Sequence, residues 1–107
     1  MKAVIWQGSS YKDLLAFPIE ARREAGFQLD KVQRGQEPDD WKPVNSAGPG
    51  VREIRIRDTG GIFRVMYVSN IGECIYVLHA FRKKTQKTSQ RDLQLARARF
   101  NAIRDEE

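Results

Sequence analysis

Apolar and charged residues alternate along residues 53–57. The apolar members are Ile54 and Ile56, and the charged members are Glu53, Arg55 and Arg57. Successive side chains of a strand point to opposite faces of a sheet. A period of two therefore predicts a half-buried strand, with the isoleucines on a core and the charged residues in water.

Two more strands are predicted directly after this one. The runs at residues 62–68 and 74–81 are rich in valine, isoleucine, tyrosine and phenylalanine, which favour extended backbone. The segments that precede them, residues 58–61 and 69–72, contain glycine and polar residues typical of turns. Together the three runs predict an antiparallel meander whose outer face carries cations.

Helical spacing marks two longer segments. The first begins at Pro18, because a missing N–H is tolerated at a helix start, and it ends at Gly35. The second is capped by Thr88 or Ser89. Each has apolar residues three or four positions apart, as expected for one buried helix face. These residues are Ala21, Ala25, Leu29 and Val32 in the first helix and Leu93, Ala96, Phe100 and Ile103 in the second.

The remaining segments complete a single α+β domain over residues 1–107. Residues 2–6 predict an opening strand, and a short helix follows through Ala16. Residues 35–50 contain three of the four prolines and predict a long loop, a kind of segment that is often functional or mobile. Trp41 in this loop either anchors it to the core or offers a stacking surface for a base. The element order is β-α-α-β-β-β-α, with a small antiparallel sheet packed against helices.

The charge of the chain is concentrated in its second half. The net charge is +5 and the pI is about 9.7. Residues 1–50 carry 7 Lys and Arg against 7 Asp and Glu, whereas residues 51–107 carry 12 against 7. A basic half beside a neutral half points to a polyanionic partner, most often a nucleic acid. The alternative is a solvated basic surface without such a partner.

Few residues of the chain are suited to metal or redox chemistry. Cys74 is the only cysteine and His79 the only histidine, so we expect neither a disulfide framework nor a metal site, and no cofactor. The apolar run at residues 3–6 is too short for a signal peptide, and no run approaches transmembrane length. The predicted compartment is the cytoplasm, without contact to a membrane.

Three segments carry a family resemblance. They read EIRIRDTGGIFRVMY, YVLHAFRKKTQKT and LQLARARF. In these segments, and in the order of elements over most of its length, the chain resembles the phage-derived HigB-like toxins of the RelE/ParE toxin–antitoxin superfamily. The resemblance implies a RelE-type fold and metal-free cleavage of mRNA on the ribosome. It also implies neutralisation by a cognate antitoxin, often one with a helix-turn-helix domain.

Metal-free cleavage of RNA uses the ribose 2′-OH as the nucleophile on the adjacent phosphate. The reaction is helped by a base for that hydroxyl, an acid for the leaving oxygen and positive charge on the transition state. By the resemblance, Arg55, Arg64 and Lys83 match basic positions of RelE-like toxins, and His79 lies in the most specific segment, LHAFRKKTQKT. Further contacts to nucleic acid are predicted at Arg57, Arg82, Lys84, Lys87 and Arg91.

The sequence leaves the general base open between two residues. RelE-like toxins often have a lysine where this chain has Glu53, so the proton is taken either by Glu53 or by His79. An imidazole suits proton transfer at neutral pH, although a lone histidine in a strand is more often structural. Arg55 and Arg64 would likewise be structural if they form salt bridges with Glu53 and Glu73.

Two other functions compete with mRNA cleavage. The superfamily also contains ParE-like inhibitors of DNA gyrase, and the same fold also suits a non-catalytic module that binds nucleic acid or protein. Cleaved mRNA, as against accumulated double-strand breaks in DNA, distinguishes the nuclease from the gyrase inhibitor.

Overall fold

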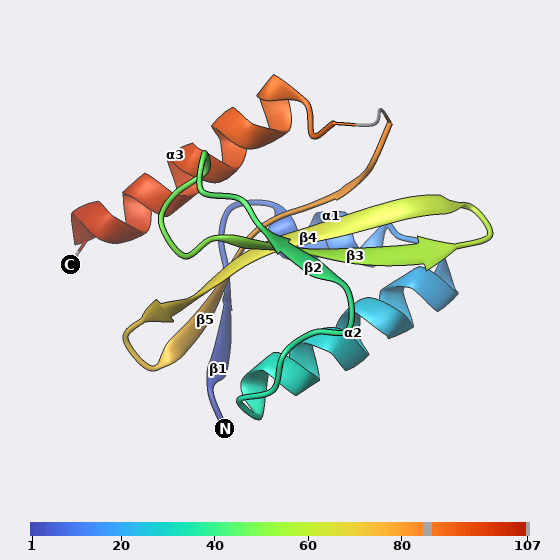
Figure 1. Ribbon diagram of the computed structural model, residues 1–107, viewed down its shortest axis with the longest axis horizontal. Coiled ribbons are helices and arrows are strands. Elements are labelled where there is room, and N and C mark those ends of the chain that lie inside the picture. Colours follow the sequence, from blue (N-terminus) through green and yellow to red (C-terminus); the bar gives the residue numbers. More distant parts are fainter. Residues whose placement is uncertain (85–86, 107) are drawn as a thin grey trace.

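A five-stranded mixed sheet lies at the centre of the protein (Figure 1). The computed structural model describes residues 1–84 and 87–106. The strand order is β1-β5-β4-β3-β2, and all neighbours are antiparallel except β1, which runs parallel to β5. The strands are β1 (Ala3–Trp6), β2 (Trp41–Pro43), β3 (Arg52–Asp58), β4 (Gly61–Ile71) and β5 (Cys74–Arg82).

The α+β class and the three-stranded meander are confirmed, but the sheet differs from the predicted one. The opening strand is present, yet its parallel pairing with β5 makes the sheet mixed, so the prediction of a purely antiparallel sheet is wrong. β2 lies within the predicted loop at residues 35–50 and pairs with β3. Trp41 is part of β2, and the guanidinium of Arg52 lies 4.0 Å from the centre of its ring.

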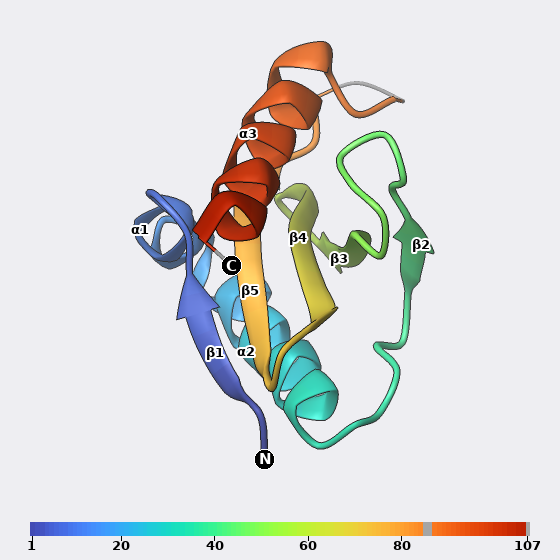
Figure 2. The same ribbon diagram turned by 90° about the vertical axis from the view of Figure 1, so that its left-hand side faces the viewer.

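Three helices cover the two faces of this sheet, namely α1 (Ser10–Leu15), α2 (Ile19–Gln33) and α3 (Gln90–Glu106). Figure 2 shows α2 along one face and α3 across the other. α2 ends as predicted, because Gly35 takes a φ of 80° and its N–H donates to the carbonyl of Val32. Ser89 caps α3 by accepting a hydrogen bond from the N–H of Asp92 at 3.1 Å. In the described part of the chain, none of the helices is long and apolar enough to cross a bilayer.

The first core lies between the sheet and the α1–α2 hairpin. Ile54 and Ile56 of β3 face it as predicted, since both are almost fully buried. The predicted stripe of α2 packs against them. The strands add Phe63, Val65, Tyr67, Ile75, Val77 and Ala80 to this core.

The second core lies on the opposite face, below α3 and the segment 44–51. The predicted stripe of α3 is confirmed, because Ala96, Phe100 and Ile103 are buried there. A Cβ atom on Gly48 would lie 2.6 Å from the ring of Phe100, so this close approach requires glycine. α3 and the segment 44–51 cover this face of the sheet only in part, since Arg57 on the same face of β3 is exposed. An open, charged part of the second face therefore remains beside the second core.

Candidate nucleic-acid interface

A buried ion pair joins β3 and β4 on the second face of the sheet. Glu53 is fully enclosed and Arg64 is 1% exposed. The guanidinium of Arg64 donates to one carboxylate oxygen of Glu53, and the hydroxyl of Thr88 donates to the other at 3.0 Å. The prediction that this side of β3 faces water is therefore wrong at Glu53, because the chain that leads into α3 reaches across it.

Two further arginines continue the same face of β3. Arg55 lies opposite Arg64 in the register of the two strands. Its Nε lies 3.6 Å from a carboxylate oxygen of Asp40, with both side chains partly exposed. Arg57 is exposed to solvent. The alternation of β3 thus places these arginines together, as the sequence predicts.

Two lysines flank this group from different strands. Lys42 of β2 lies opposite Glu53 in the β2–β3 register. Lys83 follows the end of β5, where its N–H donates to the carbonyl of Ile62 at 2.8 Å. We call the resulting group of five cations the basic basin, and its members are Lys42, Arg55, Arg57, Arg64 and Lys83.

Like charges within the basic basin act on one another. Burial lowers the pKa of Lys42, and Arg64 and Arg55 lower it further. Burial also lowers the pKa of Lys83, followed by the repulsion of Arg64, Lys42 and the two β3 arginines. A bound anion would favour the charged form of both lysines. The basin is thus a surface of positive electrostatic potential.

His79 lies on β5 and contacts the first turn of α3. Its Nε2 is 2.7 Å from a carboxylate oxygen of Asp92, whose other oxygen accepts a bond from the hydroxyl of Ser89. Its ring stacks on Phe81 with 4.5 Å between the centroids. Burial lowers the pKa of His79, and the hydrogen bond to Asp92 opposes this effect. The lowered pKa favours the neutral imidazole, and a proton on Nε2 fits the contact with the Asp92 carboxylate, which leaves the lone pair on Nδ1.

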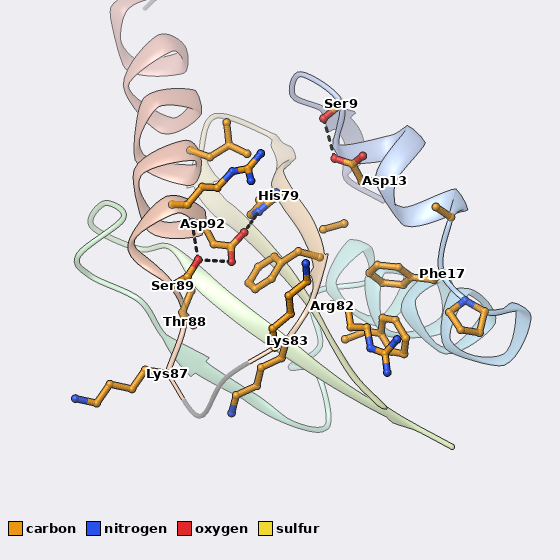
Figure 3. A pocket seen from close by; sticks show the side chains of 18 residues that line it. Ser9, Asp13, Phe17, His79, Arg82, Lys83, Lys87, Thr88, Ser89 and Asp92 are labelled. Atoms are coloured by element: carbon orange, nitrogen blue, oxygen red, sulfur yellow. Dashed lines mark hydrogen bonds and ion pairs between the residues drawn. The ribbon is translucent and has the colours of Figure 1, made fainter. Parts of the chain in front are cut away.

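An open pocket of about 940 Å³ lies beside β5, between α1 and the start of α3. Figure 3 shows His79 and Asp92 on one side of it and Phe17 on the other, with Lys83 between them. Four of the residues predicted to contact nucleic acid line this pocket: Arg82, Lys84, Lys87 and Arg91.

The predicted site residues therefore form two neighbouring groups. Arg55, Arg57 and Arg64 belong to the basic basin, whereas His79 lines the pocket. Lys83 belongs to both and connects them. Positions 85–86 of the segment LHAFRKKTQKT lie outside the described residues.

A comparison with protein-family models matches residues 12–101 to the family described as phage-derived protein Gp49-like (DUF891). The match covers most of the chain. The chain belongs to the Gp49-like family. Members of this family are commonly toxins of toxin–antitoxin systems, and the five-stranded mixed sheet with three helices is compatible with a RelE-like fold. A search of curated proteins finds no match for this Gp49-like chain.

Two residues of the Gp49-like site could not be found from the sequence. Lys42 lies in a proline-containing segment without periodicity, and only the pairing of β2 with β3 brings it to the basin. Asp92 is marked in the sequence as a first-turn acidic residue of the last helix, but its contact with His79 depends on how α3 crosses the sheet. Among residues 1–84 and 87–106, no three His, Cys, Asp or Glu side chains are grouped so that they could hold a metal ion.

Proposed function

We propose that this Gp49-like protein is the toxin of a type II toxin–antitoxin system and cleaves mRNA on the ribosome without a metal ion. The observation that carries the proposal is the basic basin, in which cations from four strands or strand ends meet on one open face. Bringing like charges together costs free energy unless an anion binds between them. The phosphates of RNA are such anions, and the family commonly supplies toxins.

The exposed cations of the basin suit the charge that develops during RNA cleavage. Arg55, Arg57 and Lys83 are at least partly exposed, and a guanidinium fork matches two phosphate oxygens. Stabilising the doubly charged transition state is the largest contribution that such residues make. Arg64 is enclosed and paired with Glu53. We therefore assign Arg64 an indirect role. Its guanidinium acts on the transition state through its electrostatic field, and it fixes the position of the Glu53–Arg64 pair.

We assign the general base to His79 rather than to Glu53. Glu53 is fully enclosed and already accepts two hydrogen bonds, from Arg64 and Thr88. His79 lines the pocket, and its lowered pKa keeps the imidazole neutral and able to accept a proton. Its Nδ1 is enclosed and accepts no hydrogen bond from the described residues. A substrate hydroxyl reaches it only after the covering side chains shift.

The proposal predicts growth arrest that depends on the basin. Induced expression should stop growth, and primer extension should map cuts within translated messages. The variant R55Q/R57Q/K83Q should lose both effects, because it removes three of the charges that hold the phosphate. The matched control K12Q/R22Q/R23Q changes the net charge equally on the α1–α2 hairpin, away from the basin, and should arrest growth like the wild type.

The expected partner is a cognate antitoxin, often a small helix-turn-helix protein. Co-expression with the product of a neighbouring reading frame should restore growth. Growth arrest with intact mRNA and accumulated double-strand DNA breaks would favour a gyrase inhibitor instead. Absence of both lesions, with binding retained, would favour a non-catalytic binding module.

A further inference from the structure

β2 brings a lysine of the neutral first half of the chain into the basic basin. Lys42 lies opposite Glu53 in the β2–β3 register, and directly opposite residues of paired strands point to the same face. Its side chain is therefore on the side of the buried Glu53–Arg64 pair. After burial, Arg64 and Arg55 are the charged groups that lower the pKa of Lys42.

Lys83 approaches the basin from the other side. Its N–H donates to the carbonyl of Ile62 on β4, and Ile62 in turn lies opposite Arg57 on β3. After burial and Arg64, Lys42 is the next cause of the lowered pKa of Lys83. The two ammonium groups thus repel each other across the basin.

Neither lysine is compensated by a carboxylate in the part of the chain that the structure describes. Among the described residues, Lys42 and Lys83 form no ion pair, and the two carboxylates of the basin are already paired with arginines. In addition, the Nε atoms of Arg55 and Arg64 are enclosed without a hydrogen-bond acceptor. Two unpaired ammonium groups beside the partly exposed guanidinium of Arg55 form an arrangement that one phosphate group can satisfy.

We propose that Lys42 is a phosphate-binding residue, whose ammonium group acts with that of Lys83 on the non-bridging oxygens of one phosphodiester above the Glu53–Arg64 pair. The assignment of this phosphate to RNA rests on the proposed function, whereas the anion site itself does not. The strand next to β3 thus supplies an amine beside Glu53.

The variant K42M should bind nucleic acid less strongly without losing stability. Burial and the neighbouring cations disfavour the charged form of Lys42, so its removal relieves repulsion in the folded protein. Thermal unfolding of K42M should therefore occur at or above the wild-type temperature. The conservative variant K42R keeps the positive charge and serves as a second test in case K42M does not fold.

Binding should be measured with a 2′-O-methyl RNA oligonucleotide, which offers phosphates but no nucleophile for cleavage. Each phosphate contact contributes roughly 0.7 to the slope of log affinity against log salt for a single strand. The slope for K42M should be smaller than that of the wild type by about this amount, and the slope for K42R should equal that of the wild type. The control K12M removes an exposed lysine of α1, and its slope should also equal that of the wild type. A K42M slope equal to the wild-type slope would overturn the proposal.

Single-turnover cleavage on ribosomes separates this inference from the proposed function. K42M should cleave about tenfold or more slowly than the wild type, and K42R should recover most of the rate, because a charge and not a proton transfer is required. If K42M cleaves at the wild-type rate, Lys42 is not part of the site although the nuclease function stands. If the wild type cleaves nothing but the oligonucleotide slope depends on Lys42, the anion site stands and the nuclease function fails.

Discussion

At the residue scale, the Glu53–Arg64 pair shows how a charged side chain can be enclosed within a basic surface. Both side chains are almost completely buried, and Thr88 completes the hydrogen bonding of the carboxylate. Removing one partner of such a pair leaves the other charge buried without compensation, which costs more than the pair itself contributes. The pair therefore couples the stability of the fold to the position of the basin.

The variant E53A should be strongly destabilised, by about 3–5 kcal/mol, because it leaves the guanidinium of Arg64 buried without a partner. The double variant E53M/R64M replaces both charges with apolar side chains and should be much less destabilised. Urea unfolding monitored by circular dichroism measures both free energies of unfolding. Equal losses in E53A and E53M/R64M would show that the two residues are not energetically coupled.

His79 predicts a pH dependence of stability. Burial is the largest cause that lowers its folded pKa below the ordinary value of 6.5, with Asp92 opposing. Between the two pKa values the unfolded chain binds the proton more readily, so stability rises with pH in this window. The contribution of the neutral imidazole is present above about pH 6.5 and is lost as the pH falls through the folded pKa.

The measurement compares urea unfolding of the wild type and H79Q at about pH 7.5 and about pH 5, the range in which an imidazole titrates. The wild type should lose more stability on acidification than H79Q. Because His79 is the only histidine, its NMR signals give the folded pKa directly. An equal loss in both proteins would assign the acid sensitivity to carboxylates instead.

The sequence predicts which residues share a face more readily than it predicts what covers that face. The alternation of β3 correctly placed Ile54 and Ile56 on the core and Arg55 with Arg57 on the other side. It could not show that Thr88 reaches Glu53, because that contact joins residues far apart in the chain. The structural alternative for Arg64, a salt bridge with Glu53, is present in the structure.

At the element scale, two glycines in different settings test how tightly the segment 44–51 packs below α3. Gly48 has a φ of 150°, and an added Cβ would lie 2.6 Å from the ring of Phe100. Gly26 lies inside α2, and an added Cβ would meet no atom within 4 Å. The same chemical change should therefore have opposite effects at the two positions.

G48A should destabilise the protein by about 1–3 kcal/mol, because it overpacks the second core and strains the backbone. G26A should stabilise it by up to about 1 kcal/mol, since alanine favours a helix interior over glycine. Thermal unfolding of the two variants beside the wild type measures both effects. A harmless G48A would mean that the segment is free to move away from α3.

The sequence predicts every helix and four of the five strands, but it does not predict β2. α2 and α3 have enough apolar repeats to define a face, and β3 to β5 have clear turns between them. β2 has three residues, and its only signature is the ladder that it forms with β3. For β1 the strand itself was predicted, but its parallel partner was not, because strand periodicity contains no information about pairing between distant segments.

At the scale of the whole molecule, the two halves of the chain contribute unequally to the basin. The second half carries the excess charge and supplies all of its members except Lys42. Composition could therefore indicate a polyanionic partner and the region that contacts it. It could not locate the second group of cations at the pocket, which forms only where β5 passes between α1 and α3.

The parallel pairing of β1 with β5 has a consequence for synthesis of the protein. Residues 3–6 are synthesised well before their partners, residues 74–77, and pairings between such distant segments form slowly. The second core in addition requires α3 as far as Ile103. A nascent chain therefore cannot complete its sheet or enclose the Glu53–Arg64 pair until nearly all of it has emerged. By this order of assembly, the basic basin is complete only after α3 has been synthesised.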